Sequence, residues 1–168
     1  SLASWALVAA EHQQAENRRA ARLYLVFAAF SAVCLVPAIG LLAGPAGDLS
    51  FASIRDMPPE GLTAALVLGL VVAGAGAKAG LVPLHAWLPD AHTQAPTAGS
   101  ILLAGLLLKT GAYGPYRFPP MLFPDATVML APYGMALGAA GAIYGGLVAC
   151  GQQDAKRLVA YASIAHMG

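Results

Sequence analysis

Charged residues are scarce in this chain. They make up 10% of its 168 residues, whereas an average soluble domain contains roughly 25%. The net charge is +1 and the mean hydropathy is +0.67, which excludes a disordered chain and a nucleic-acid binder that relies on a basic patch. Cysteine is also rare. Cys34 and Cys150 lie far apart in apolar stretches, so neither a disulfide framework nor a cysteine-based zinc site is indicated.

The sequence contains long apolar runs with few or no charged residues. A helix needs about 20 apolar residues to cross about 30 Å of hydrocarbon. The chain offers four runs of this kind: Leu23–Gly47, Gly61–Leu88, Pro96–Phe118 and Ala126–Gln153. The shorter runs Ser1–Ala10 and Leu158–Gly168 are expected to be parts of two further spans. We therefore predict an all-α, polytopic transmembrane helix bundle, a single domain over residues 1–168 that is the middle portion of a longer protein.

The basic residues predict an orientation in the membrane. Alternate loops on one side hold five of them: Arg18, Arg19, Arg22, Lys156 and Arg157. The opposite loops hold Arg55, in the Gly-, Pro- and Asp-rich connection Pro45–Glu60, and Arg117. Cytoplasmic loops carry an excess of lysine and arginine. We therefore expect the first side to be cytoplasmic, in the inner membrane of a cell that is expected to be bacterial.

Lys109 lies deep inside the third run. It is the fourteenth residue of Pro96–Phe118, which places it about 20 Å from one end of a helix. A lysine at that depth costs roughly 2.5–3.5 kcal/mol on insertion scales, so we expect it to face protein or water. The functional interpretation is a protonatable group in an ion path, and the alternative is a lysine that extends to the membrane surface. The Pro119–Pro120 pair is predicted to end this helix.

Lys78 is expected to lie at a break in a helix. The run Gly61–Leu88 would be about 42 Å long as one helix, more than a straight span requires. The glycines and prolines of this region gather toward one end: Gly74, Gly76, Gly80, Pro83 and Pro89. We predict an interruption near Gly80–Pro83, between Gly76 and Pro83. Broken helices in membranes line a cavity or ion path, so Lys78 is expected to face other helices, with extension to the inner surface as the alternative.

Titratable side chains follow the predicted break in the sequence LHAWLPDAH, Leu84–His92. Two histidines and one carboxylate lack a third strong ligand and a regular helical offset, which argues against a metal site. Histidine titrates near neutral pH, so His85 and His92 are predicted to take part in proton relay or proton entry. An ordinary interfacial loop with Trp87 as its membrane anchor is the alternative.

Two residues near the end of the chain are weaker relay candidates. Lys156 belongs to a polar loop before the last apolar stretch, where it is either an anchor at the cytoplasmic surface or a relay residue. His166 lies well inside that stretch.

A glycine pattern precedes these two residues in the sequence. Gly134, Gly138, Gly141 and Gly145 fall on one helical face, which predicts close packing of a neighbouring helix rather than chemistry.

Two long motifs resemble a known family. The first is KAGLVPLHAWLPDAHTQAPTAGSILLAGLLLKTGAYG (Lys78–Gly114) and the second is DAKRLVAYASIAHMG (Asp154–Gly168). Both resemble signatures of the antiporter-like membrane subunits of respiratory complex I, the proton-translocating NADH–quinone oxidoreductase, and most of all its M-type or chain 4 subunits. The opening segment SLASWALVAAEHQQAENRRA is more similar to membrane subunits of formate-hydrogenlyase-type hydrogenases. Multisubunit cation/proton antiporters share the same spans.

The resemblance implies a fold of about fourteen helices built from two inverted repeats of five helices, of which this chain holds a middle portion. It implies that Lys78 matches the lysine at the broken helix and Lys109 the lysine of the next helix in a proton path. A glutamate normally pairs with the broken-helix lysine. By spacing, its position lies just before Ser1, and Glu11 and Glu16 do not take its place.

The functional hypothesis is a proton-translocating subunit that relays protons through buried lysines. The expected partners are other membrane-arm subunits and the lipid bilayer, with no nucleic acid. NADH, flavin, iron–sulfur clusters and quinone are expected on partner subunits, with no cofactor or metal in this chain. A membrane electron carrier with a b-type haem is a rival of another class, but it needs histidines facing each other at similar depth, and only His166 lies well inside an apolar run. A passive scaffold is the third possibility.

Overall fold

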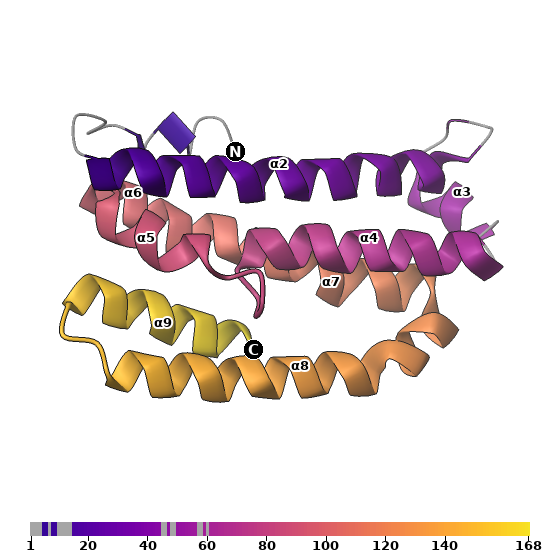
Figure 1. Cartoon of the computed structure of the whole chain (residues 1–168). Helices are drawn as coiled ribbons and strands as arrows, with labels where there is room; N and C mark the ends of the chain where they lie inside the picture. The colour runs from indigo at the N-terminus through magenta and orange to yellow at the C-terminus, as the bar shows by residue number, and fades with distance from the viewer. Residues whose placement is uncertain are drawn as a thin grey trace.

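A computed structural model describes residues 5, 6, 8, 9, 15–44, 47, 50–56, 59 and 61–168, with Phe51 and Arg55 described by their backbone alone. Over this part of the chain every regular element is helical (Figure 1). In order these are α2 (Ala15–Ala43), α3 (Phe51–Asp56), α4 (Gly61–Ala79), α5 (Trp87–Gln94), α6 (Thr97–Leu102), the π-helical segment η1 (Leu103–Leu107), α7 (Leu108–Leu122), α8 (Pro124–Cys150) and α9 (Ala155–Met167). The predicted all-α class is confirmed. The expectations for Ser1–Ala10 and Glu11 lie mostly outside the described residues.

Three described helices are long and apolar enough to cross a membrane: α2 with 29 residues, α4 with 19 and α8 with 27. The fourth expected span lies in the run Pro96–Phe118. The run Pro96–Phe118 does fold as helix, but as α6, η1 and α7 in succession. The π-helical turn of η1 divides it, because each residue there bonds one position further along the chain than in an α-helix. The three pieces follow one another without a gap from Thr97 to Leu122, so the expected fourth span remains a prediction.

The prediction that Pro119–Pro120 ends this helix is wrong, since α7 continues to Leu122 with both prolines inside it. A proline lacks the N–H but keeps its carbonyl, and the Pro119 carbonyl accepts a hydrogen bond from the Phe123 N–H at 2.8 Å. The helix ends where Phe123 adopts φ −137°. Phe123 precedes Pro124, and a residue before proline is driven out of the helical region.

The long helices run side by side with their ends in two groups (Figure 1). One end holds the start of α2, the short helices α5 and α6, and the connection from α8 to α9; the other holds α3 and the connection from α7 to α8. The first end therefore carries the basic residues at the starts of α2 and α9. Helix α2 packs on α4, α4 on α7 and α8 on α9.

The glycine face of α8 packs as predicted over part of its length. A Cβ atom at Gly145 would lie 2.7 Å from the Ala165 nitrogen of α9, and one at Gly141 would meet Val82 at 3.6 Å. Gly134 differs, because no described atom lies within 4 Å of its Cβ position. The close approach of α8 to α9 and the residue after it therefore depends on Gly138 and Gly145, where a side chain would displace backbone.

We expect Gly145→Ala to destabilise the full-length protein by about 1–3 kcal/mol, because the added methyl group overpacks the α8–α9 contact. Gly146→Ala is the matched control, since its Cβ position is open and alanine is the better helix former by about 1 kcal/mol. Thermal unfolding of both variants in detergent measures the difference. Equal midpoints for the two variants would show that α8 and α9 do not need this glycine.

Candidate functional site at the broken helix

The chain breaks its helix immediately after Lys78. Helix α4 ends at Ala79 and α5 begins at Trp87, which confirms the predicted interruption between Gly76 and Pro83. Gly80 has φ +71°, a left-handed conformation that glycine adopts without a Cβ penalty. The Leu81 N–H then bonds the Gly76 carbonyl at 3.0 Å. This six-to-one bond with a left-handed glycine is the Schellman termination of a helix, and it places Lys78 in the last turn.

Trp87 closes the break from the other side. Its indole N–H donates a hydrogen bond to the Ala77 carbonyl at 2.8 Å, one of the carbonyls left without a partner where a helix ends. The side chain is only 2% exposed, and its ring contacts the Tyr24 ring edge to face at a centroid distance of 5.2 Å. The alternative in which Trp87 anchors an interfacial loop is therefore wrong. It is a core residue that joins the two halves of the broken helix.

Helix α7 packs against the peptide that carries Lys78. A Cβ atom at Gly111 would lie 2.8 Å from the Ala79 nitrogen and 3.1 Å from the Lys78 carbonyl carbon. Leu88 and Leu108 are fully buried beside this contact. The missing side chain at Gly111 thus lets α7 approach the end of α4 at backbone distance, which fixes the position from which Lys78 extends.

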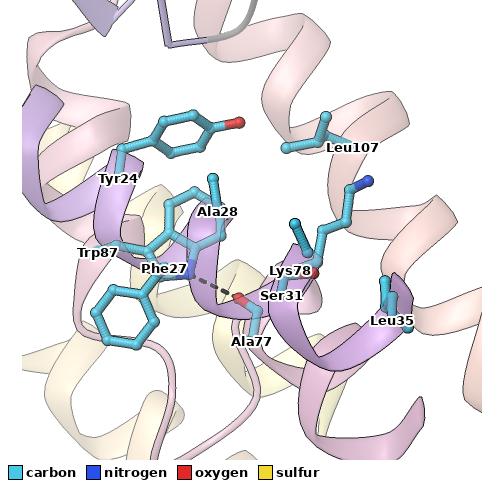
Figure 2. A pocket seen from close by; sticks show the side chains of 10 residues that line it. Tyr24, Phe27, Ala28, Ser31, Leu35, Ala77, Lys78, Trp87 and Leu107 are labelled. Atoms are coloured by element: carbon cyan, nitrogen blue, oxygen red, sulfur yellow. Dashed lines mark hydrogen bonds between the residues drawn. The ribbon is translucent and has the colours of Figure 1, made fainter. Parts of the chain in front are cut away.

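Lys78 reaches into a cavity between α2 and η1. The space open to the centre of a water molecule is about 90 Å³. Its walls are six residues of α2 from Tyr24 to Leu35, together with Ala77, Lys78, Trp87 and Leu107. Figure 2 shows the Lys78 amine and the Tyr24 hydroxyl extending into this space. The half-buried amine faces other helices, as expected for a lysine at a helix break.

Lys109 lies on a different side of the bundle. It is the second residue of α7, directly after η1, and its side chain is exposed. Residues two apart on a helix point to nearly opposite sides, and Gly111 faces α4. Lys109 therefore points away from α4, and it does not line the Lys78 cavity. The structure does not bring the two lysines together, although Gly111 packs α7 directly against the peptide of Lys78.

His92 is buried on a helix, not placed in a loop. It lies on α5 with 4% of its surface exposed, and its Nε2 atom has no hydrogen-bond partner among the described residues. Its main-chain carbonyl accepts a hydrogen bond from the Ser100 hydroxyl at 3.0 Å. His85 lies in the turn before α5, half-buried, with its ring 5.1 Å from the Tyr144 ring of α8. His92 is thus buried on α5, whereas His85 lies in a turn against α8.

Lys156 ties α9 to the end of α5. Its ammonium group donates to the main-chain carbonyls of Thr93 at 3.3 Å and Ala95 at 3.4 Å, where a helix end favours positive charge. The Asp154 carboxylate accepts from the Lys156 N–H at 2.9 Å and so caps the start of α9. The Arg157 guanidinium lies 4.0 Å from the Asp90 carboxylate of α5. Sequence reasoning missed this contact between α5 and α9.

His166 is not part of the cavity. It lies on α9 with an exposed side chain, and its Nδ1 atom is 2.7 Å from the Ala162 carbonyl of its own helix. The described residues also bring no three His, Cys, Asp or Glu side chains together.

Sequence reasoning missed Tyr24 and Ser31, which face Lys78 from α2. A signal was present, because the two residues are seven apart in an apolar helix and so share one face.

Comparison with known proteins places this arrangement in a family. The sequence profile described as "NADH:quinone oxidoreductase/Mrp antiporter, TM" matches residues 1–168, the entire chain. The chain belongs to the NADH:quinone oxidoreductase/Mrp antiporter family. With three helices of membrane-spanning length and composition, this family member is part of a multi-pass membrane protein.

Two curated relatives illustrate the match. NADH-quinone oxidoreductase subunit M of Pseudomonas aeruginosa is 58% identical over 103 residues, which cover 61% of this chain and 20% of the relative. NAD(P)H-quinone oxidoreductase chain 4 3 of Picosynechococcus is 42% identical over 157 residues, which cover 90% of this chain and 28% of the relative. The matched stretches thus cover less than a third of the length of each relative.

Two solved structures have the same fold as this chain. Respiratory complex I from Thermus thermophilus with bound NADH matches with a TM-score of 0.81 and 27% identity, over 90% of this chain and 33% of that chain. An archaeal membrane-bound sulfane sulfur reductase matches with a TM-score of 0.89 and 24% identity, over 99% of this chain and 34% of that chain. The second likeness concerns the fold alone. Both structures are of respiratory complexes.

Proposed function

We propose that this chain is part of a proton-translocating membrane subunit of an NADH–quinone oxidoreductase. The observation that carries the proposal is Lys78, whose amine extends from the last turn of a broken helix into a cavity between helices. An ionisable side chain inside a membrane bundle marks an ion or proton path, and discontinuous helices form such sites in transporters. The relatives named subunit M and chain 4 favour the same function.

In this proposal Lys78 and Lys109 hold and release protons in turn. The Lys78 ammonium passes a proton to water, and the amine that remains takes up another proton. Because Lys109 faces away from the cavity, water and side chains of the rest of the protein carry the proton between the two lysines. His85 and His92 are relay or entry residues, and Lys156 and His166 are weaker candidates of the same kind.

The energy for transport comes from partner subunits in this proposal. NADH, flavin, iron–sulfur clusters and quinone belong to them, and the other membrane-arm subunits and the bilayer surround this chain. The whole subunit has about fourteen helices in two inverted repeats and lies in the bacterial inner membrane with the basic end of the bundle in the cytoplasm.

A membrane subunit of a formate-hydrogenlyase-type hydrogenase or of a multisubunit cation/proton antiporter is the second proposal. It is favoured by the fold shared with the archaeal sulfane sulfur reductase and with the Mrp complex from Dietzia, which matches with a TM-score of 0.79. The genes adjacent to this one test the choice. Genes for NADH-dehydrogenase subunits support the first proposal, whereas hydrogenase or small antiporter genes support the second.

Lys109→Ala tests the proposed proton path. In the full-length protein within its complex, we expect proton uptake into vesicles to fall by about a hundredfold or more, the contribution typical of a positioned proton-transfer group in enzymes. Lys109→Arg should also impair uptake, because a guanidinium stays charged. Histidine at this position should retain part of the activity, because its ring titrates near neutral pH.

The content of assembled complex is measured in parallel, and Arg19→Ala serves as the control. Arg19 is an exposed basic residue on α2 that belongs to no part of the proposed path. Normal proton uptake by Lys109→Ala in fully assembled complex would show that Lys109 is structural.

A further inference from the structure

The α2 wall of the Lys78 cavity carries two hydroxyl groups. From Leu23 to Ala43, α2 is apolar, and its hydroxyl-bearing residues in that stretch are Tyr24 and Ser31. Both are buried, at 3% and 4% exposure, and both line the cavity with Lys78. Seven residues are about two helical turns, so the two hydroxyl groups lie along one face of α2, and that face is turned to Lys78.

The cavity has the size and the polar groups that water needs. A site holds one water molecule if about 10–15 Å³ is open to the centre of that molecule and two to four polar partners surround it. Here about 90 Å³ is open, and the Tyr24 hydroxyl, the Ser31 hydroxyl and the Lys78 amine all border it. The space therefore accommodates several water molecules in contact with these three groups.

The ring contact between Tyr24 and Trp87 does not involve the Tyr24 hydroxyl group. The Tyr24 ring contacts the Trp87 ring edge to face at 5.2 Å, and a phenylalanine ring would make the same contact. Figure 2 shows the Tyr24 hydroxyl directed away from Trp87, into the space that Lys78 also enters. The Tyr24 hydroxyl therefore borders the cavity that Lys78 enters.

We propose that Tyr24 and Ser31 hold water molecules against Lys78, so that α2 forms a hydrated wall on which this lysine exchanges its proton. This inference rests on the proposed function and adds two positioning residues to it. The Lys78 ammonium gives a proton to a held water molecule, which passes its own proton onward, and the neutral amine accepts the next proton by the reverse transfer. No oxidant or co-reactant is required.

Lys78 is the charged residue of this cavity, and Tyr24 is its other titratable group. The remaining lining residues of α2, α4, α5 and η1 are apolar, apart from Ser31 and the indole N–H of Trp87. The indole N–H is already bonded to the Ala77 carbonyl. Among the described residues that line this space, the two hydroxyl groups are therefore the polar side-chain groups that border it together with Lys78 and Trp87.

The test uses Tyr24→Phe, Ser31→Ala and the double variant in the full-length protein within its complex. Proton uptake into vesicles is recorded across a range of pH, together with the content of assembled complex. We expect the double variant to slow uptake by about tenfold, the effect of losing two ordinary hydrogen bonds to water, and to displace the pH profile. Tyr116→Phe, which changes a tyrosine that is 82% exposed on α7, is the matched control and should match the unmodified protein.

The pH profile separates a positioning role from a structural one. A structural loss lowers uptake at every pH and leaves the shape of the profile unchanged, whereas a change in the water around Lys78 moves the profile along the pH axis. The inference is overturned if the double variant matches the unmodified protein, or if it lowers uptake without displacing the profile. Lys78→Ala in the same assay tests the proposed function separately, because normal uptake by that variant removes Lys78 itself from the path.

Discussion

Replacing Lys78 with alanine in the full-length protein is expected to reduce proton uptake by about a hundredfold or more, the contribution typical of a positioned proton-transfer group. The backbone of the break should persist, because Gly80, the Leu81–Gly76 hydrogen bond and the Trp87–Ala77 hydrogen bond fix it without the lysine side chain. Lys78→Ala therefore removes a titratable group from the cavity while the helices that surround it stay in place.

Lys78→Arg sharpens this test. The guanidinium fills a similar volume and keeps the positive charge, but it does not release its proton at any accessible pH. If charge alone were needed, the arginine variant would transport protons normally, and if proton exchange is needed, both variants fail. Uptake is measured in vesicles at equal content of assembled complex. Normal uptake by the alanine variant would remove the proposed function of the broken helix.

The second large effect is expected for Trp87→Ala. The change empties a buried aromatic site, which typically costs about 3–5 kcal/mol, and it removes the hydrogen-bond donor to the Ala77 carbonyl. Trp87→Phe keeps an aromatic ring near Tyr24 but removes the N–H, so it should cost about 1–3 kcal/mol for the buried carbonyl left without a partner. The difference in stability between the two variants separates the contribution of packing from that of the hydrogen bond at the break.

Thermal unfolding of the full-length protein in detergent measures both changes. Tyr133→Ala on α8 is the control for loss of an aromatic side chain, since Tyr133 is 75% exposed and its removal should change stability little. An unfolding midpoint for Trp87→Ala equal to that of the control would show that the two halves of the broken helix are held together by other contacts.

Local features of the fold could be predicted from the sequence because they depend on the residue that carries them. Gly80 permits the positive φ that ends α4, and the predicted interruption between Gly76 and Pro83 follows from that local chemistry. The same is true of the all-α class, since long uncharged runs have few other solutions in a membrane. The rule that proline ends a helix did not predict the end of α7. Pro119 and Pro120 remain inside α7, and the helix ends at Phe123, which precedes the next proline.

The partners across helices were decided by the tertiary structure alone. Trp87 reaches the Ala77 carbonyl, Lys156 reaches the carbonyls at the end of α5, and Tyr24 and Ser31 face Lys78 from another helix. Gly145 packs against α9 while Gly134 on the same face does not. The physical reason is that a membrane helix that is apolar on every side carries little pattern to show which face packs inward. Its rotation and depth are set by close packing with neighbours. The sequence by itself therefore determined that Lys78 lies at a helix break, and only the packing of α2 and η1 determined what surrounds its side chain.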